Sequence, residues 1–78
     1  MKRACFVFTN WAGRFAAFNA AAAYEASRGN HITASAMRAR RDYAQNQAKM
    51  RFPDRFEESW SDRVAEMTAR IPLGETRL

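Results

Sequence analysis

The side chains best suited to chemistry are cationic and amide groups in the middle of the chain. Four of them recur at intervals of 3, 4 and 4 residues and therefore share one helix face: Arg38, Arg41, Gln45 and Lys49. Guanidinium groups form bidentate bonds to phosphate and carboxylate, and amides bond to base edges. We therefore expect a partner-binding surface made by Arg14, Arg28, Arg38, Arg40, Arg41, Gln45, Lys49 and Arg51.

The partner of such a surface is anionic, and two classes of macromolecule fit. Nucleic acid or a nucleoprotein complex is the first expectation, because residues 34–51 contain five cations and a single acid, Asp42. This composition suits phosphate contacts. An acidic surface of a protein target is the alternative, since arginine is also enriched at protein interfaces. The same charges also suit a plain solvated helix face.

Catalysis has little support in the sequence. Cys5 and His31 are the single cysteine and the single histidine, too few for a zinc site with about four Cys and His ligands. A nucleophile also needs a nearby base and an oxyanion stabiliser. Glu25, Asp62 and Glu66 follow no metal-ligand pattern. The sequence therefore predicts a non-enzymatic protein with no cofactor and no metal.

The length of 78 residues allows one domain, spanning 1–78. Thirteen basic and eight acidic residues give a net charge of +5, and the charge is uneven. Residues 1–51 hold nine basic residues against two acids, whereas residues 52–78 hold four against six. Sixteen of the apolar residues are alanine, so the core is thin. Thin cores favour association, and we expect that a homodimer can form through residues 4–8 or a seam of Met37, Ala44 and Ala48.

Hydrophobic periodicity predicts an all-α, compact three-helix domain. The expected helices span about 11–28, 34–51 and 54–71. Gly29 is placed to end the first helix, and Phe52-Pro53 stops the second. Thr33 or Ser35 is expected to cap the second helix, and Asp54 the third.

Each expected helix has an apolar stripe that we assign to the core. In the first helix it consists of Trp11, Phe15, Phe18, Ala22 and Ala26. In the second it consists of Ile32, Ala36, Ala39, Tyr43 and Met50. In the third it consists of Phe56, Trp60, Val64, Met67 and Ile71, the clearest amphipathic pattern of the chain. With these stripes in the core, the cationic row of the second helix faces solvent.

Residues 4–8 form a short apolar segment before the first expected helix. We expect an extended N-terminal arm packed across the helices. The alternative is an α+β fold with residues 4–8 as a strand, because Phe6, Val7 and Phe8 favour strands by propensity. Five apolar residues are too few for a secretory signal, and no stretch approaches the ~18 that a membrane span requires. A cytoplasmic protein without membrane contact is therefore expected.

In size, in arginine and alanine content and in its lack of catalytic motifs, the chain is similar in kind to small accessory proteins of phages and mobile elements, including anti-CRISPR inhibitors. The similarity includes no shared motif, so it implies a role for no particular residue. It implies an alternative function, in which the protein binds and blocks a host protein or its nucleic-acid-binding surface. A helical homo-oligomer with a structural or adaptor role is the third function considered.

Overall fold

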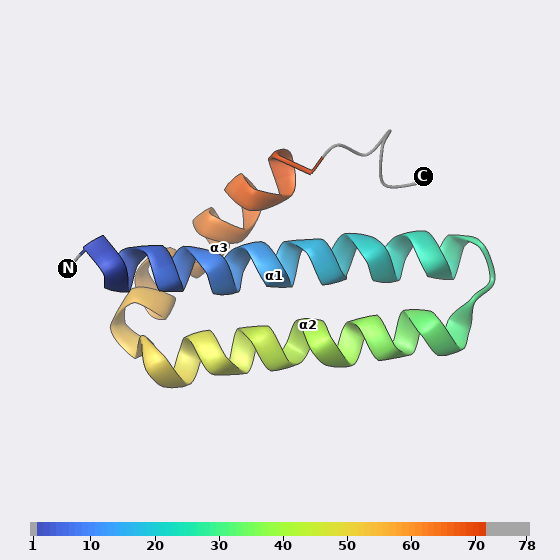
Figure 1. The fold of residues 1–78 in the computed structure, drawn as a ribbon, viewed down its shortest axis with the longest axis horizontal. Helices are drawn as coiled ribbons and strands as arrows, with labels where there is room; N and C mark the ends of the chain where they lie inside the picture. The colour runs from blue at the N-terminus through green and yellow to red at the C-terminus, as the bar shows by residue number, and fades with distance from the viewer. Residues whose placement is uncertain (1, 72–78) are drawn as a thin grey trace.

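Three α-helices make up the chain in a computed structural model, which describes the backbone of residues 2–71 and the side chains of residues 7–71. They are α1 (Lys2–Ser27), α2 (His31–Arg51) and α3 (Pro53–Ala69). α1 and α2 run antiparallel along the long axis, and α3 turns back to cross α1 (Figure 1). Residues 2–71 contain no strand, so the all-α three-helix prediction is confirmed and the α+β alternative is wrong.

The turn between α1 and α2 is built around Gly29, as the sequence predicts. Gly29 has a positive φ of 83°, a left-handed conformation that glycine adopts at little cost. Its N–H donates to the carbonyl of Ala26 at 3.0 Å, and the N–H of Asn30 donates to the carbonyl of Glu25 at 2.9 Å. These two bonds are the Schellman pattern that closes a helix C-terminus. The chain therefore reverses tightly, and α2 begins at His31 without the expected Thr33 or Ser35 cap.

The junction between α2 and α3 is a single non-helical residue, Phe52. Its φ and ψ of −136° and 61° lie outside the α region, which Pro53 disfavours for the preceding residue. Pro53 occupies the first turn of α3, where a missing N–H is tolerated, and Asp54 lies inside that turn rather than at the expected cap position. The short connection places the start of α3 beside the end of α2.

The core combines aromatic rings from α1 and α3 with alanines from α1 and α2. Its central cluster contains Phe8, Ala12, Ala48 and Trp60, with six larger side chains packed against it: Trp11, Phe15, Phe52, Phe56, Val64 and Met67. The α3 stripe predicted from sequence is confirmed, since Trp60 is buried and the other four residues of that stripe are half-buried. Trp60 stacks on Phe56 with ring centroids 5.0 Å apart and meets Phe15 edge-on at 5.5 Å.

The predicted N-terminal arm is wrong, because α1 already begins at Lys2 and includes residues 4–8. Extending the helix places Phe8 one turn before Ala12 on the buried face. Phe8 is 1% exposed and makes edge-on contacts with Phe52 and Trp60, with centroids 5.7 and 5.9 Å apart. Packing in the core therefore overrides the strand propensity of this segment.

The predicted core face of α2 is also wrong. Ile32, Tyr43 and Met50 are 89%, 59% and 73% exposed, and Ala36 and Ala39 are exposed too. The buried residues of α2 are instead three alanines: Ala34, Ala44 and Ala48. On α1 the buried alanines are Ala12, Ala16 and Ala22. Small side chains on both helices let the two backbones approach closely, and this contact takes precedence over the larger residues of α2.

Candidate functional site

The outward side of α2 carries the large hydrophobic side chains that are exposed among the described residues, Ile32, Tyr43 and Met50. We call it the outer face of α2, made of Ile32, Ala36, Ala39, Tyr43 and Met50. It extends over 19 residues, from Ile32 to Met50, and their 18 steps of 1.5 Å span about 27 Å. Single exposed apolar residues are common, but a contiguous apolar stripe in a small protein marks an interaction surface.

A groove between α1 and α2 adjoins the outer face. Its volume is about 400 Å³, and we call it the α1–α2 groove; it is lined by Trp11, Arg14, Phe18, Ala39, Arg40, Tyr43 and Ala44. Ala39 and Tyr43 belong to both the groove and the outer face. Aromatic and alanine side chains make up most of its lining, and Arg14 and Arg40 supply the charge. The groove can therefore hold an apolar group next to an anion.

Three guanidinium groups gather around the aromatic wall of this groove. The Cζ atoms of Arg14 and Arg51 lie 4.8 and 5.7 Å from the ring of Trp11, and Trp11 meets Tyr43 edge-on at 6.3 Å. Arg40 lines the groove on the α2 side. No acid lines the groove, so the positive potential of these groups is not neutralised there. The Nε1–H of Trp11 is buried without an acceptor among the described residues.

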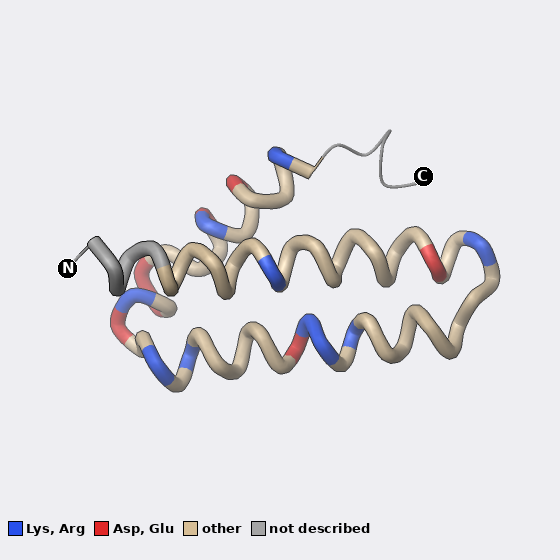
Figure 2. The backbone as a smooth tube through the Cα atoms, viewed as in Figure 1, with Lys and Arg blue, Asp and Glu red and all other residues tan. Residues whose placement is uncertain are grey.

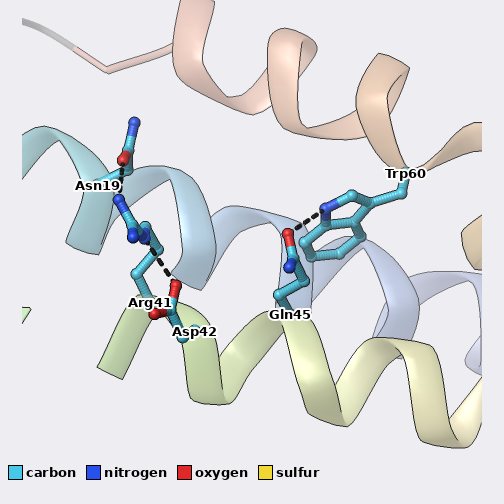
Figure 3. Close-up of polar contacts among 5 residues, drawn as sticks. All are labelled: Asn19, Arg41, Asp42, Gln45 and Trp60. Carbon is cyan, nitrogen blue, oxygen red and sulfur yellow. Dashed lines mark hydrogen bonds and ion pairs between the residues drawn. The ribbon is translucent and has the colours of Figure 1, made fainter. Parts of the chain in front are cut away.

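Arg41 and Gln45 face the other helices rather than solvent (Figure 3). Arg41 donates through Nη1 to Oδ1 of Asn19 on α1 and through Nε to Oδ1 of Asp42, each at 3.0 Å. Gln45 accepts a hydrogen bond from the Nε1–H of Trp60 on α3 at 3.2 Å. The predicted solvent-facing row of Arg38, Arg41, Gln45 and Lys49 is therefore split. Its two middle members, Arg41 and Gln45, bond to α1 and α3, because they lie on the side of α2 that faces the other two helices.

The remaining candidates are exposed but lie in different surroundings. Lys49 lines a depression of about 580 Å³ beside four acids of α3, which are Asp54, Glu57, Glu58 and Asp62. Arg28 lies at the turn, with its Cζ 5.4 Å from the ring of Tyr24. Arg38 is exposed on the same side of α2 as Lys49. Figure 2 shows the cations of α2 in two groups, near its middle and near its end.

The structure separates the two residues considered for nucleophilic chemistry. Cys5 lies near the start of α1 and His31 follows its end, so roughly 30 Å of helix lies between their backbones. The side chain of Cys5 lies outside the described residues. In the described part of the chain, no three His, Cys, Asp or Glu side chains gather where they could hold a metal ion. None of the helices in residues 2–71 has both the length and the apolar character to cross a membrane.

Sequence reasoning gave no role in a groove to Trp11, Phe18 and Tyr43, which it assigned to the core. Trp11 does pack against the core cluster and Phe18 is half-buried, whereas Tyr43 is exposed. All three belong to apolar stripes, and the pattern does not distinguish a stripe that packs inside the domain from one that meets a partner. The available signal was that α2 has two apolar faces, one of alanines and one of larger residues. Only one of the two can face α1.

The fold and this surface define a class: an all-α three-helix domain that exposes an apolar helix face bordered by arginines. In comparisons with known proteins, no family model, no curated protein and no solved structure matches the chain.

Proposed function

We propose that this chain is a non-enzymatic binding protein that recognises an anionic macromolecule, and that the partner is an acidic protein surface. One observation supports the proposal above all: the α1–α2 groove joins an exposed apolar face to uncompensated arginines. In the accessory-inhibitor function considered from the sequence, this binding would block a surface that the partner needs for its own contacts.

A protein surface fits the outer face of α2 better than nucleic acid does. Ile32 and Met50 offer an aliphatic and a thioether group, and removing these groups from water is favourable. Neither group makes hydrogen bonds to phosphates or base edges. Protein interfaces combine a buried apolar centre with a polar rim. Arginine and aromatic residues are enriched in such interfaces. Trp11, Tyr43 and the neighbouring Arg40 match that composition.

The proposal is tested by affinity capture from the native host, with and without nuclease treatment. The wild-type chain is compared with Arg40/Arg51→Gln, which removes two charges beside the groove. The matched control is Arg63/Arg70→Gln, which removes two charges from α3, where both residues pair with Glu66. We expect one stoichiometric protein that resists nuclease and is lost only with Arg40/Arg51→Gln. Capture that disappears with nuclease, or that both variants weaken equally, contradicts the proposal.

Nucleic acid is the second candidate, and the guanidinium groups around Trp11 favour it specifically. Arg14 and Arg51 lie against the indole ring, and aromatic rings flanked by arginine stack single-stranded bases. A gel-shift titration with a single-stranded oligonucleotide across a salt series tests this function. Contacts to several phosphates predict a steep loss of affinity as salt rises. Absence of binding at low salt eliminates this candidate and leaves the protein partner.

A further inference from the structure

The outer face of α2 repeats with the period of a paired helix. Together with Asn46, which lies between Tyr43 and Met50, its residues follow one another at steps of 4, 3, 4, 3 and 4. We call these six residues the seam: Ile32, Ala36, Ala39, Tyr43, Asn46 and Met50. Alternating steps of 3 and 4 define a heptad, the pattern of a helix that packs lengthwise against a second helix. A single polar residue such as Asn46 is tolerated in a heptad seam and sets its register. The period therefore indicates a helical partner.

Most of this seam faces solvent in the described part of the chain, although Tyr43 meets Trp11 of α1 edge-on. All six of its residues are exposed, and α1 contacts the opposite side of α2, through the buried Ala34, Ala44 and Ala48. The seam must gain its contacts from outside the chain or remain in water.

The seam contains both large and small residues, and its depth varies accordingly. Ile32 and Tyr43 project beside the exposed Ala36 and Ala39, and at Ala39 the surface opens into the α1–α2 groove. In helix pairing, a side chain of one helix inserts into a hole between residues of the other. The groove of about 400 Å³, walled by Trp11 and Tyr43, is such a hole for a large apolar side chain.

The charges beside the seam select the partner's chemistry. At 100° per residue, Arg40 and Arg51 border one side of the seam, and Asp42, Lys49 and Arg38 border the other. All five are exposed. The single acid of α2, Asp42, is paired with Arg41 at 3.0 Å. The side of Arg40 and Arg51 is therefore purely cationic and favours Asp and Glu on the facing flank of a helix seated in the seam. The other side is mixed, since Lys49 lies there beside acids of α3.

A second copy of this chain fits the seam less well. A two-fold symmetric dimer places the same surface on itself. Antiparallel pairing of the outer face with itself therefore brings Arg40 and Arg51 of one copy against the same two residues of the other, with no acid on that side. Like charges across an interface are unfavourable. Charge complementarity thus favours a different, acidic chain.

We propose that the outer face of α2 and the α1–α2 groove bind one amphipathic helix of a partner protein. That helix has large apolar residues at heptad spacing, one of which enters the groove, and it has Asp and Glu on the flank that faces Arg40 and Arg51. The inference rests on the proposed function and names the kind of protein segment that is bound. It assigns binding to apolar residues for which charge alone predicts no role.

Two labelled peptides and two variants test the inference. One peptide is designed with leucine at the heptad positions and glutamate beside them, and the other has the same composition in an order that breaks the heptad. Ala39→Glu fills the groove with an acid, and the matched control Ala65→Glu changes an exposed alanine of α3. Both sites are exposed, so both variants are expected to fold, which circular dichroism checks. Binding is measured by fluorescence anisotropy.

We expect the heptad peptide to bind at least about tenfold more tightly than the scrambled one, and Ala39→Glu to weaken it by roughly tenfold or more, as for an interface hot spot. Ala65→Glu is expected to bind as the wild type does. Equal affinity for both peptides, with Ala39→Glu behaving like Ala65→Glu, overturns helix docking and leaves recognition of acidic partners intact. Failure of both peptides overturns the proposed function as well.

Two further measurements exclude the other occupants of the seam. Light scattering that shows a dimer dissociated by Ala39→Glu overturns the inference in favour of a second copy. Displacement of the heptad peptide by a single-stranded oligonucleotide of higher affinity overturns it in favour of nucleic acid. A monomer that retains the peptide in the presence of the oligonucleotide supports the inference.

Discussion

The hydrogen bond between Trp60 and Gln45 allows the orientation of α2 to be measured in solution. The Nε1–H of Trp60 donates to Oε1 of Gln45 at 3.2 Å, and Trp60 is buried at the centre of the aromatic cluster. If Gln45 faced solvent, as the charge pattern of the sequence predicts, the two residues would not be coupled. We therefore expect Trp60→Phe and Gln45→Ala to affect stability in a non-additive way.

The magnitudes follow from the bond and its burial. A domain of 78 residues has a free energy of unfolding of about 4–12 kcal/mol, and a buried Trp→Ala change costs about 3–5 kcal/mol, so Phe is the safer replacement. Trp60→Phe removes the hydrogen bond and some buried ring area, and we expect it to lower the free energy of unfolding by about 2 kcal/mol in total. Gln45→Ala leaves the indole N–H without its partner, for about 1–2 kcal/mol. The double variant is expected to cost about 1 kcal/mol less than the sum.

Urea denaturation followed by far-ultraviolet circular dichroism measures these differences. For a chain of this size, 1 kcal/mol moves the unfolding midpoint by about 1 M urea. Gln47→Ala is the control, because Gln47 accepts a bond from Arg51 on the exposed side and does not contact Trp60. Additivity of Trp60→Phe and Gln45→Ala within about 0.3 kcal/mol would refute the inward orientation of Gln45.

Other substitutions have expected effects that the same denaturation assay checks. Gly29→Ala is expected to lower the free energy of unfolding by about 1 kcal/mol, because φ is +83° there and nothing lies near the added Cβ. Gly13→Ala is expected to raise it by up to about 1 kcal/mol, since the added Cβ lies 3.2 Å from the mobile end of Met67 and the helix gains propensity. Trp11→Phe is expected to change stability by less than about 1 kcal/mol, because it removes a buried donor that has no acceptor. Ile32→Ser is expected to stay within about 0.5 kcal/mol of wild type, as befits an 89% exposed side chain, and a loss typical of core residues would contradict the exposed outer face.

Much of the fold is predictable from local signals. Gly29 and Pro53 act through their own backbone restrictions, so the two helix breaks follow from residue type. The α3 stripe follows from periodicity, because α3 has only one apolar face to bury. The N-terminal segment was not predictable in this way. Phe8 favours a strand locally, and only its contacts with Phe52 and Trp60 make the helical extension favourable.

The candidate site was predictable in composition but not in orientation. Arg14, Arg40 and Arg51 were correctly placed among the exposed candidates, whereas Arg41 and Gln45 turned out to contact α1 and α3. A rotation of α2 about its axis changes which of these residues are exposed and which contact the other helices. Periodicity measures which residues share a face, and it does not measure where that face points.

The sequence by itself determined three helices, their breaks, the apolar face of α3 and the excess of positive charge in α2. The tertiary structure alone decided which of the two apolar faces of α2 is buried. The buried face is that of Ala34, Ala44 and Ala48, because α1 has the alanines Ala12 and Ala16 on its own buried face. Two alanine faces pack at close range. The larger residues of α2 were thereby left outside, next to arginines. The surface available to a partner is the consequence of that packing.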